Sequence, residues 1–155
     1  MVTFAALTAL ALAPAPSLSR VVLSNGVTLQ VATQGPSSGP AIIMLHGLSD
    51  SWFSFSRVLP LFPPDRRIVV PDLRGHGDSD RPVEYRMADF AGDVIRLMDA
   101  LKIEKAAIVG HSMGSFLRQR AGYSPELVTS EILNSMMTDV PSSIGATRSY
   151  CGNFS

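Results

Sequence analysis

Short, uninterrupted apolar runs recur along this chain, with helical patterns between them. Runs of this kind predict strands that are buried on both faces of a sheet. They cover residues 41–47, the first half of 66–77, 105–110 and 127–133. Strands that alternate with helices predict an α/β fold, in which a mostly parallel sheet carries flanking helices.

Residues 87–101 carry the clearest helical pattern. Apolar side chains recur there at three- and four-residue spacing. They form one stripe, which consists of Met87, Phe90, Val94, Leu97 and Leu101. The charged side chains of Asp89, Asp93 and Arg96 are expected to fall largely outside this stripe.

Three further segments complete the expected architecture. Residues 20–33 consist of two β-rich runs around Asn25 and Gly26, a pair that suits a tight hairpin turn with positive φ. Residues 50–62 fit a short helix, and residues 112–123 fit another that stops before a proline.

The N-terminal segment leaves two interpretations open. Residues 4–19 combine an apolar core with small residues, as a secretory signal does, but the first positive side chain is Arg20. A signal normally begins with positive charge, so a disordered leader is the alternative. We expect the folded domain to begin near Arg20, and a cytoplasmic location is favoured over a secreted one.

Composition narrows the class of protein. A chain of 155 residues with 46% hydrophobic and 17% charged residues is typical of one globular domain. Thirteen basic residues balance thirteen acidic ones, which gives no electrostatic case for binding nucleic acid. The single cysteine, Cys151, excludes an internal disulfide, and no apolar run reaches the roughly 18 residues of a membrane-spanning helix.

The most specific chemical signal is the segment Gly110-His111-Ser112-Met113-Gly114, which lies between a predicted strand and a predicted helix. This context suits a nucleophile elbow, a sharp turn that lifts a serine hydroxyl above the sheet. Glycines on both sides leave room for close backbone approach. An ordinary turn with a helix-capping serine is the alternative.

Three motifs in this order resemble the N-terminal half of the α/β-hydrolase fold family. They are "LHG" at 45–47, "DLRGHGDSDRP" at 72–82 and "GHSMG" at 110–114. The resemblance covers roughly residues 20–134 and implies a serine hydrolase of the esterase, lipase, C–C hydrolase or non-haem haloperoxidase-like type, acting on a small acyl substrate. It also argues against the epoxide hydrolase and haloalkane dehalogenase branches, because these carry an aspartate where this chain has Ser112.

The resemblance assigns roles to several residues. Ser112 would be the nucleophile, and the backbone N–H groups of Met113 and Leu48 would form the oxyanion hole. Trp52 and Phe53 follow Leu48 in the chain, and we expect them to pack in the core rather than touch substrate. Neither the motifs nor the family calls for a cofactor or a metal.

The histidines depart from the family pattern. In this fold the general base follows the nucleophile in the chain, yet His46, His76 and His111 all precede Ser112. Each resembles a structural position of the family. We therefore expect none of them to act as the base, and the isolated chain to be inactive.

The acidic partner is a weaker assignment. Asp139 follows the last predicted strand, where some family members keep this residue, and a solvated loop carboxylate is the alternative. Asp72 and Asp78 lie in the glycine-rich turn, where we expect them to brace loops. Their surroundings lack the spacing of a metal site.

The expected organisation is a leader at residues 1–19, a partial α/β-hydrolase domain at 20–134 and an irregular tail at 135–155. The fold would be truncated after about the sixth strand, residues 127–133, whose exposed edge would favour self-association. The expected function is a serine ester hydrolase that lacks its later elements. A non-catalytic remnant or interaction module is the alternative.

Overall fold

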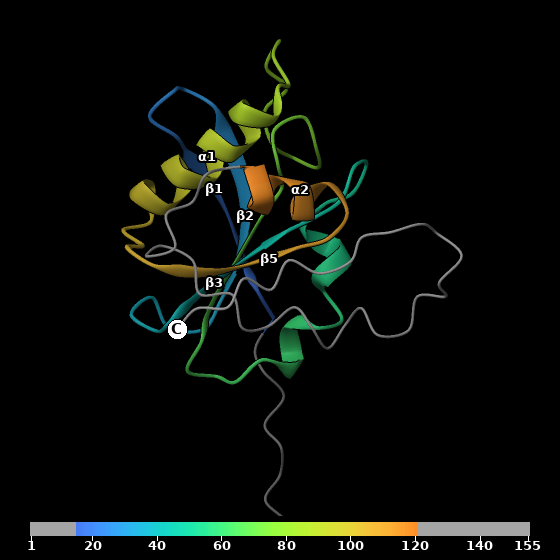
Figure 1. Cartoon of the computed structure of the whole chain (residues 1–155). Coiled ribbons are helices and arrows are strands. Elements are labelled where there is room, and N and C mark those ends of the chain that lie inside the picture. The colour runs from blue at the N-terminus through green and yellow to red at the C-terminus, as the bar shows by residue number, and fades with distance from the viewer. Residues whose placement is uncertain (1–14, 121–155) are drawn as a thin grey trace, which may run out of the picture.

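The structure, a computed structural model, describes residues 15–120. Within this part, five strands form one sheet in the order β1-β2-β4-β3-β5 (Figure 1). The strands are β1 Ser17–Val22, β2 Thr28–Gln34, β3 Ala41–Leu45, β4 Arg67–Pro71 and β5 Ala106–Gly110.

The sheet is mostly parallel, as predicted. β3 pairs in parallel with both β4 and β5. β2 runs antiparallel to its neighbours β1 and β4, so β1 points in the same direction as β3, β4 and β5. The carboxyl ends of β3, β4 and β5 therefore lie at one edge of the sheet.

The two faces of the sheet carry separate apolar layers. Residues alternate between the faces along each strand, because successive strand side chains point to opposite sides. One layer packs against α1 (Met87–Ala100) and α2 (Met113–Arg120) and includes Ile43, Leu45, Val69, Ile108, Phe90, Val94 and Leu97. The other packs against two short 3₁₀ helices, η1 (Trp52–Phe55) and η2 (Leu59–Leu61), and includes Ile42, Met44, Ile68, Val70 and Val109. Figure 1 shows α1 and α2 together on one side of the sheet.

The helix predicted over 87–101 is confirmed as α1, which ends at Ala100 with Leu101 as its C-cap. Arg86 precedes the helix with extended backbone, and its N–H donates to the Asp89 carboxylate at 3.0 Å. This contact satisfies an amide at the start of the helix, where a negative charge is also favoured by the helix dipole.

The predicted hairpin is also present, and the positive φ of its turn lies at the glycine alone. Gly26 has φ 83°, whereas Asn25 is not among the residues with positive φ. The N–H of Gly26 donates to the Leu23 carbonyl, and the Leu23 N–H donates to the Val27 carbonyl. This is a three-residue loop that needs a left-handed residue at only one position, which glycine supplies.

The single short helix predicted over 50–62 is wrong, because the structure has η1 and η2 there. The hydroxyl of Ser54 donates to the Ser51 carbonyl at 2.8 Å, and Ser51 caps η1 through its side chain. Serine hydroxyls that bond to nearby backbone compete with a continuous α-helix. Pro60, in the first turn of η2, has no N–H to donate to a preceding turn, so a continuous helix does not run from η1 into η2.

Some predictions fall outside the described part of the chain. These are the strand at 127–133, the end of the helix over 112–123, Asp139 and Cys151. α2 begins at Met113, one residue after the expected start at Ser112.

Candidate active site

Three loops meet at the carboxyl edge of the parallel strands. They are the β3 loop (residues 46–51), the β4 loop (residues 72–80) and the serine turn (residues 110–114). In open α/β sheets this edge is where ligands bind. The N–H of His111 donates to the Leu45 carbonyl at 2.9 Å, which ties the serine turn to the end of β3.

Ser112 has an exposed side chain and a left-handed backbone. It stands between the end of β5 and the start of α2, and its φ is 51°. Few residues other than glycine adopt this conformation, which costs of order 1–3 kcal/mol and persists only where the surroundings enforce it. The chain thus holds one exposed hydroxyl at a strained strand-to-helix turn.

The glycines of the serine turn are required by close backbone packing. A Cβ at Gly110 would overlap the backbone of Gly114, and a Cβ at Gly114 would overlap the carbonyl of Leu45 in β3. Backbone atoms of this kind cannot move aside as a flexible side chain could. The two bare positions allow the turn to lie directly on β3.

The β3 loop lies against the serine turn at Gly47. A Cβ at Gly47 would lie 3.2 Å from the Ser112 Cβ and 3.2 Å from His111 Nδ1. The next residue, Leu48, has a side chain that is 71% exposed. Among the hydrogen bonds of residues 15–120, neither the Leu48 N–H nor the Met113 N–H is a donor.

His46 is held by backbone groups at both ring nitrogens. Its Nδ1 lies 2.7 Å from the Gly47 carbonyl oxygen, and its Nε2 accepts from the Leu73 N–H at 2.9 Å. A carbonyl can only accept and an amide N–H can only donate, so the partners assign the proton to Nδ1. Burial lowers the pKa of His46 below its ordinary value, which favours this neutral ring.

The other two histidines contact different groups. His76 Nδ1 donates to the Arg74 carbonyl at 2.9 Å, and its ring lies edge-on to the His46 ring at 5.1 Å between centroids. His111 has an exposed side chain. The hydrogen bonds of the described residues include none between a histidine and Ser112.

Asp72 joins two loops through its carboxylate. It accepts from the Trp52 N–H at 2.6 Å and from the Asp78 N–H at 3.1 Å. The side chain is 1% exposed, so these backbone donors replace the water that it has lost. Asp72 therefore connects the β4 loop to the end of the β3 loop, while Asp78 contributes its backbone.

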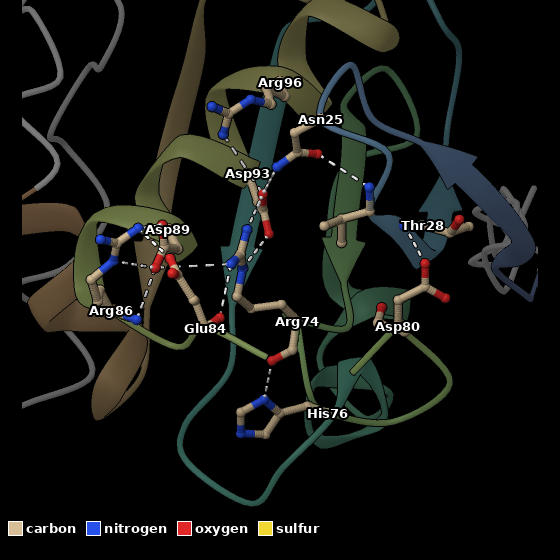
Figure 2. Close-up of polar contacts among 12 residues, drawn as sticks. Asn25, Thr28, Arg74, His76, Asp80, Glu84, Arg86, Asp89, Asp93 and Arg96 are labelled. Atoms are coloured by element: carbon tan, nitrogen blue, oxygen red, sulfur yellow. Dashed lines mark hydrogen bonds and ion pairs between the residues drawn. The ribbon is translucent and has the colours of Figure 1, made fainter. Parts of the chain in front are cut away.

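A buried ion pair anchors the β4 loop to α1, and the sequence pattern missed it. Arg74 donates to both oxygens of Asp93 at 2.7 Å, and Asn25 donates to one of them at 2.9 Å (Figure 2). The prediction that Asp93 lies outside the apolar stripe is wrong, because its side chain is 1% exposed. Asp93 lies three residues after Phe90 and four residues before Leu97, a spacing that places it on the apolar face of the helix. This spacing could have predicted its burial.

Trp52 and Phe53 differ in their surroundings. Trp52 is half-buried and packs beside the apolar layer that includes Met44 and Val109. Phe53 is 65% exposed and lies edge-on to Trp52 at 5.6 Å between ring centroids. The core-packing expectation fits Trp52 but is wrong for Phe53.

Residues 15–120 contain no group of three metal-ligating side chains. None of the helices described there is both long and apolar enough to cross a bilayer. An open hollow of about 340 Å³ lies at the C-terminal end of α1, where the chain leads into β5, away from the carboxyl edge. It is lined by Ile95, Met98, Asp99, Lys102, Ile103 and Glu104.

Comparison with known proteins connects this arrangement to one family. A family model for the alpha/beta hydrolase fold matches residues 40–148. The AB hydrolase superfamily protein YfhM from Bacillus subtilis is 37% identical over 97 residues, which are 60% of this chain and 34% of that protein. Epoxide hydrolase 3 from Siraitia grosvenorii is 36% identical over 98 residues, which are 61% of this chain and 30% of that protein.

Solved structures agree with this match. The crystal structure of a putative acyltransferase from Salmonella enterica superposes with a TM-score of 0.70 at 35% sequence identity. The superposition covers 77% of this chain and 41% of that one. The chain spans about a third of the length of the two curated relatives named above.

Proposed function

Because the chain belongs to the alpha/beta hydrolase fold family, we propose that it carries the nucleophile of a serine hydrolase acting on ester or related acyl bonds. The observation that carries the proposal is the backbone of Ser112, which keeps φ 51° while its side chain is exposed. Strain of this kind clusters at active sites, where the surrounding structure enforces it.

The oxyanion hole of this proposal consists of the Met113 and Leu48 N–H groups. The Met113 N–H is the first amide of α2, where the helix dipole favours negative charge. Leu48 follows Gly47, which lies against Ser112. One backbone donor from the turn of the nucleophile and one from the loop that lies against it suit the negative oxygen that forms when a carbonyl is attacked.

The proposed reaction begins with attack of the Ser112 oxygen on the acyl carbonyl carbon. A general base takes the hydroxyl proton and returns it to the leaving group, and water then releases the acyl group from the serine. His46 cannot serve as this base, because both ring nitrogens are bound to backbone. We place the base and its acid outside residues 15–120, with Asp139 kept as the candidate acid.

The names of the relatives state different reactions, and the serine at position 112 favours one of these reactions. The names include an epoxide hydrolase and a putative acyltransferase. A serine hydroxyl becomes a good nucleophile only when a base removes its proton, and it then forms an acyl ester. We therefore favour acyl transfer to water over epoxide opening for this chain.

The second candidate is a non-catalytic domain that keeps the fold for interaction. It is supported by the histidines, since His46 and His76 are both hydrogen-bonded to backbone carbonyls. A serine without a base keeps an alcohol-like pKa and reacts slowly near neutral pH. This candidate predicts that Ser112 stays unreactive in every assembly of the chain.

Probe labelling separates the two candidates. The chain is co-expressed with the part of a related hydrolase that follows its own matched region and carries the acid and the histidine. We expect a fluorophosphonate probe to label Ser112 in this complex and not in the isolated chain. The isolated chain should hydrolyse p-nitrophenyl acetate no faster than its Ser112→Ala variant.

Two variants control this experiment. Ser112→Ala should abolish labelling, whereas Ser38→Ala, which removes an exposed hydroxyl from another loop, should leave it unchanged. A soluble complex in which Ser112 stays unlabelled would support the non-catalytic candidate. Hydrolysis of an epoxide in place of the acyl ester would overturn the assignment of substrate class.

A further inference from the structure

The ring of His46 controls the direction of one peptide group. Its Nδ1–H donates to the carbonyl of Gly47 at 2.7 Å, and this carbonyl belongs to the peptide group that joins Gly47 to Leu48. A trans peptide is planar, so its C=O and N–H point in opposite directions. The hydrogen bond that holds the Gly47 oxygen therefore also turns the Leu48 N–H away from the ring.

The β4 loop determines which ring nitrogen carries the proton. Leu73 N–H donates to His46 Nε2 at 2.9 Å, and an acceptor at this position must be unprotonated. The proton of the neutral ring is then on Nδ1, where the Gly47 carbonyl needs it. His46 is fully buried, so no water competes for either nitrogen.

The orientation matters because of what lies beside this peptide. Gly47 approaches Ser112 so closely that a Cβ at Gly47 would lie 3.2 Å from the Ser112 Cβ. Ser49, in the same loop, has φ 61°, so the loop is held in a conformation that a free chain rarely adopts. The second attachment of the loop is the bond from the Trp52 N–H to Asp72 at 2.6 Å.

We propose that His46 is a positioning residue, whose neutral ring, protonated at Nδ1, fixes the Leu48 N–H in the direction that an oxyanion hole beside Ser112 requires. The inference rests on the proposed function for its catalytic meaning. It acts through the Gly47–Leu48 peptide, so His46 itself touches neither substrate nor nucleophile. Its role is distinct from that of a general base.

Protonation of the ring would remove the acceptor at Nε2 and keep the donor at Nδ1, so the contact that depends on pH is the one to Leu73. A charged ring would carry N–H on both nitrogens, and Nε2–H would then face the Leu73 N–H. The charged and titratable groups that face the ring are His76, Asp72 and Asp50. Burial, the largest effect, and His76 oppose its protonation, whereas the hydrogen bond to the Gly47 carbonyl and then the two carboxylates favour it.

Solid-state NMR on the full chain tests the geometry without requiring activity or a monomeric sample. The chain is labelled with ¹³C and ¹⁵N and measured at pH 7.5. We expect His46 to show a protonated Nδ1 and an unprotonated Nε2. As the pH is lowered, the Leu73 amide shift should change with the same midpoint as the His46 ring, because a charged ring no longer accepts at Nε2, whereas the Met113 amide shift should not follow it.

Two substitutions separate the two bonds of the ring. His46→Asn keeps an N–H donor near the place of Nδ1, and His46→Gln keeps an acceptor near the place of Nε2. We expect the Leu48 amide shift to be retained in His46→Asn and changed in His46→Gln. An unchanged Leu48 amide in His46→Gln would overturn the proposal.

Probe labelling in the co-expressed complex adds the catalytic consequence. Loss of one oxyanion-hole donor slows such reactions by about 10²-fold or more. His46→Gln should lower the rate of Ser112 labelling by about this factor, and His46→Asn should retain most of the rate. Equal rates in both variants would contradict the proposal. If Ser112 stays unlabelled in every complex, the proposed function fails, while the Leu48 shifts still decide the role of His46.

Discussion

At the serine turn an exposed hydroxyl lies on a left-handed backbone, whereas at the β4 loop a charged pair is buried and fully hydrogen-bonded. Ser112 has φ 51° and an exposed side chain. The Arg74 and Asp93 side chains are 6% and 1% exposed, and both Asp93 oxygens accept hydrogen bonds. The first region keeps its polar groups available, and the second keeps its polar groups occupied.

The two regions are connected through the β3 loop. Arg74 of the β4 loop binds Asp93 of α1. The neighbouring residue in this loop, Leu73, donates its N–H to the ring of His46. His46 in turn holds Gly47, which lies against Ser112. Rigid support of this kind is what a reactive site needs, since its own residues are strained and exposed. Removing one partner of the buried pair should therefore cost stability, whereas relieving the backbone strain at Ser112 should add it.

The largest effect is expected at the buried pair. Arg74→Met removes one partner and leaves the Asp93 carboxylate buried without its main donor, which should lower the free energy of unfolding by about 3–5 kcal/mol. Arg96→Met is the matched control, because Arg96 approaches the same carboxylate at 3.7 Å from a side chain that is 37% exposed. Exposed pairs contribute only about 0–1 kcal/mol. Urea denaturation measures both.

A double variant shows whether the cost comes from the orphaned charge. Arg74→Met combined with Asp93→Leu removes both charges and should be more stable than Arg74→Met alone. If the double variant is the less stable of the two, the loss in Arg74→Met does not arise from the buried carboxylate. The contrast between the exposed serine turn and the buried, hydrogen-bonded pair would then be unsupported.

The second effect concerns the close contact of the serine turn with β3. Gly114→Ala introduces a Cβ that overlaps the Leu45 carbonyl, and we expect a loss of about 1–3 kcal/mol from overpacking. The same substitution in α1, Gly92→Ala, meets only the movable end of the Arg96 side chain. Alanine is the better helix former by about 0.5–1 kcal/mol, so Gly92→Ala should stabilise the chain.

These two substitutions are expected to change the free energy of unfolding in opposite directions. Denaturation midpoints of both variants, measured under the same conditions, test this expectation. Both glycines lie in helices, so helix propensity alone predicts stabilisation in both variants. A stabilising Gly114→Ala would mean that the serine turn is not packed against β3 as described.

Much of this architecture was predictable from the apolar pattern alone. The buried strands and α1 follow from short apolar runs and a helical stripe, which are local properties of the sequence. The serine turn follows from the glycines around Ser112. The two 3₁₀ helices were missed because serine hydroxyls and Pro60 compete with a helix at the level of single hydrogen bonds.

The supporting contacts were harder to predict, because they join distant segments. Asp93 lies on the apolar face of α1, and its burial depends on Arg74 in a different loop. The tautomer of His46 depends on the Leu73 N–H, which belongs to the loop after the neighbouring strand. Periodicity carries no information about such pairings.

The third effect is the pH dependence of stability that His46 contributes. Burial lowers its pKa from 6.5 in the folded state, so the unfolded chain binds the proton first as the pH falls. The free energy of unfolding should therefore decrease below about pH 6.5 and stop decreasing at the folded-state pKa. Between these two pKa values the decrease approaches about 1.4 kcal/mol for each pH unit. Asp80 and Asp89, whose pKa values are lowered by hydrogen bonds, lose their stabilising contribution only in a more acidic range.

Urea midpoints at pH 7.5, 6.5 and 5.5 test this, with His46→Asn as the control. The variant retains the donor to Gly47 but has no group that titrates in this range. Its midpoints should change less with pH than those of the unmodified chain. Equal slopes would show that another group causes the pH dependence.

The smallest effect isolates the strain at Ser112. Ser112→Gly and Ser112→Ala both remove the hydroxyl, but only glycine adopts φ 51° without steric cost. Release of this strain outweighs the greater freedom of glycine in the unfolded chain, so Ser112→Gly should be the more stable by about 1 kcal/mol. The same pair at Ser115 in α2, which is not among the residues with positive φ, should show the reverse order, because glycine is the poorer helix former. Denaturation midpoints for the four variants give the stability difference between glycine and alanine at position 112, which is then compared with the same difference at position 115. The same order at both positions would mean that Ser112 is unstrained, and the contrast between an exposed strained turn and a buried satisfied pair would have to be abandoned.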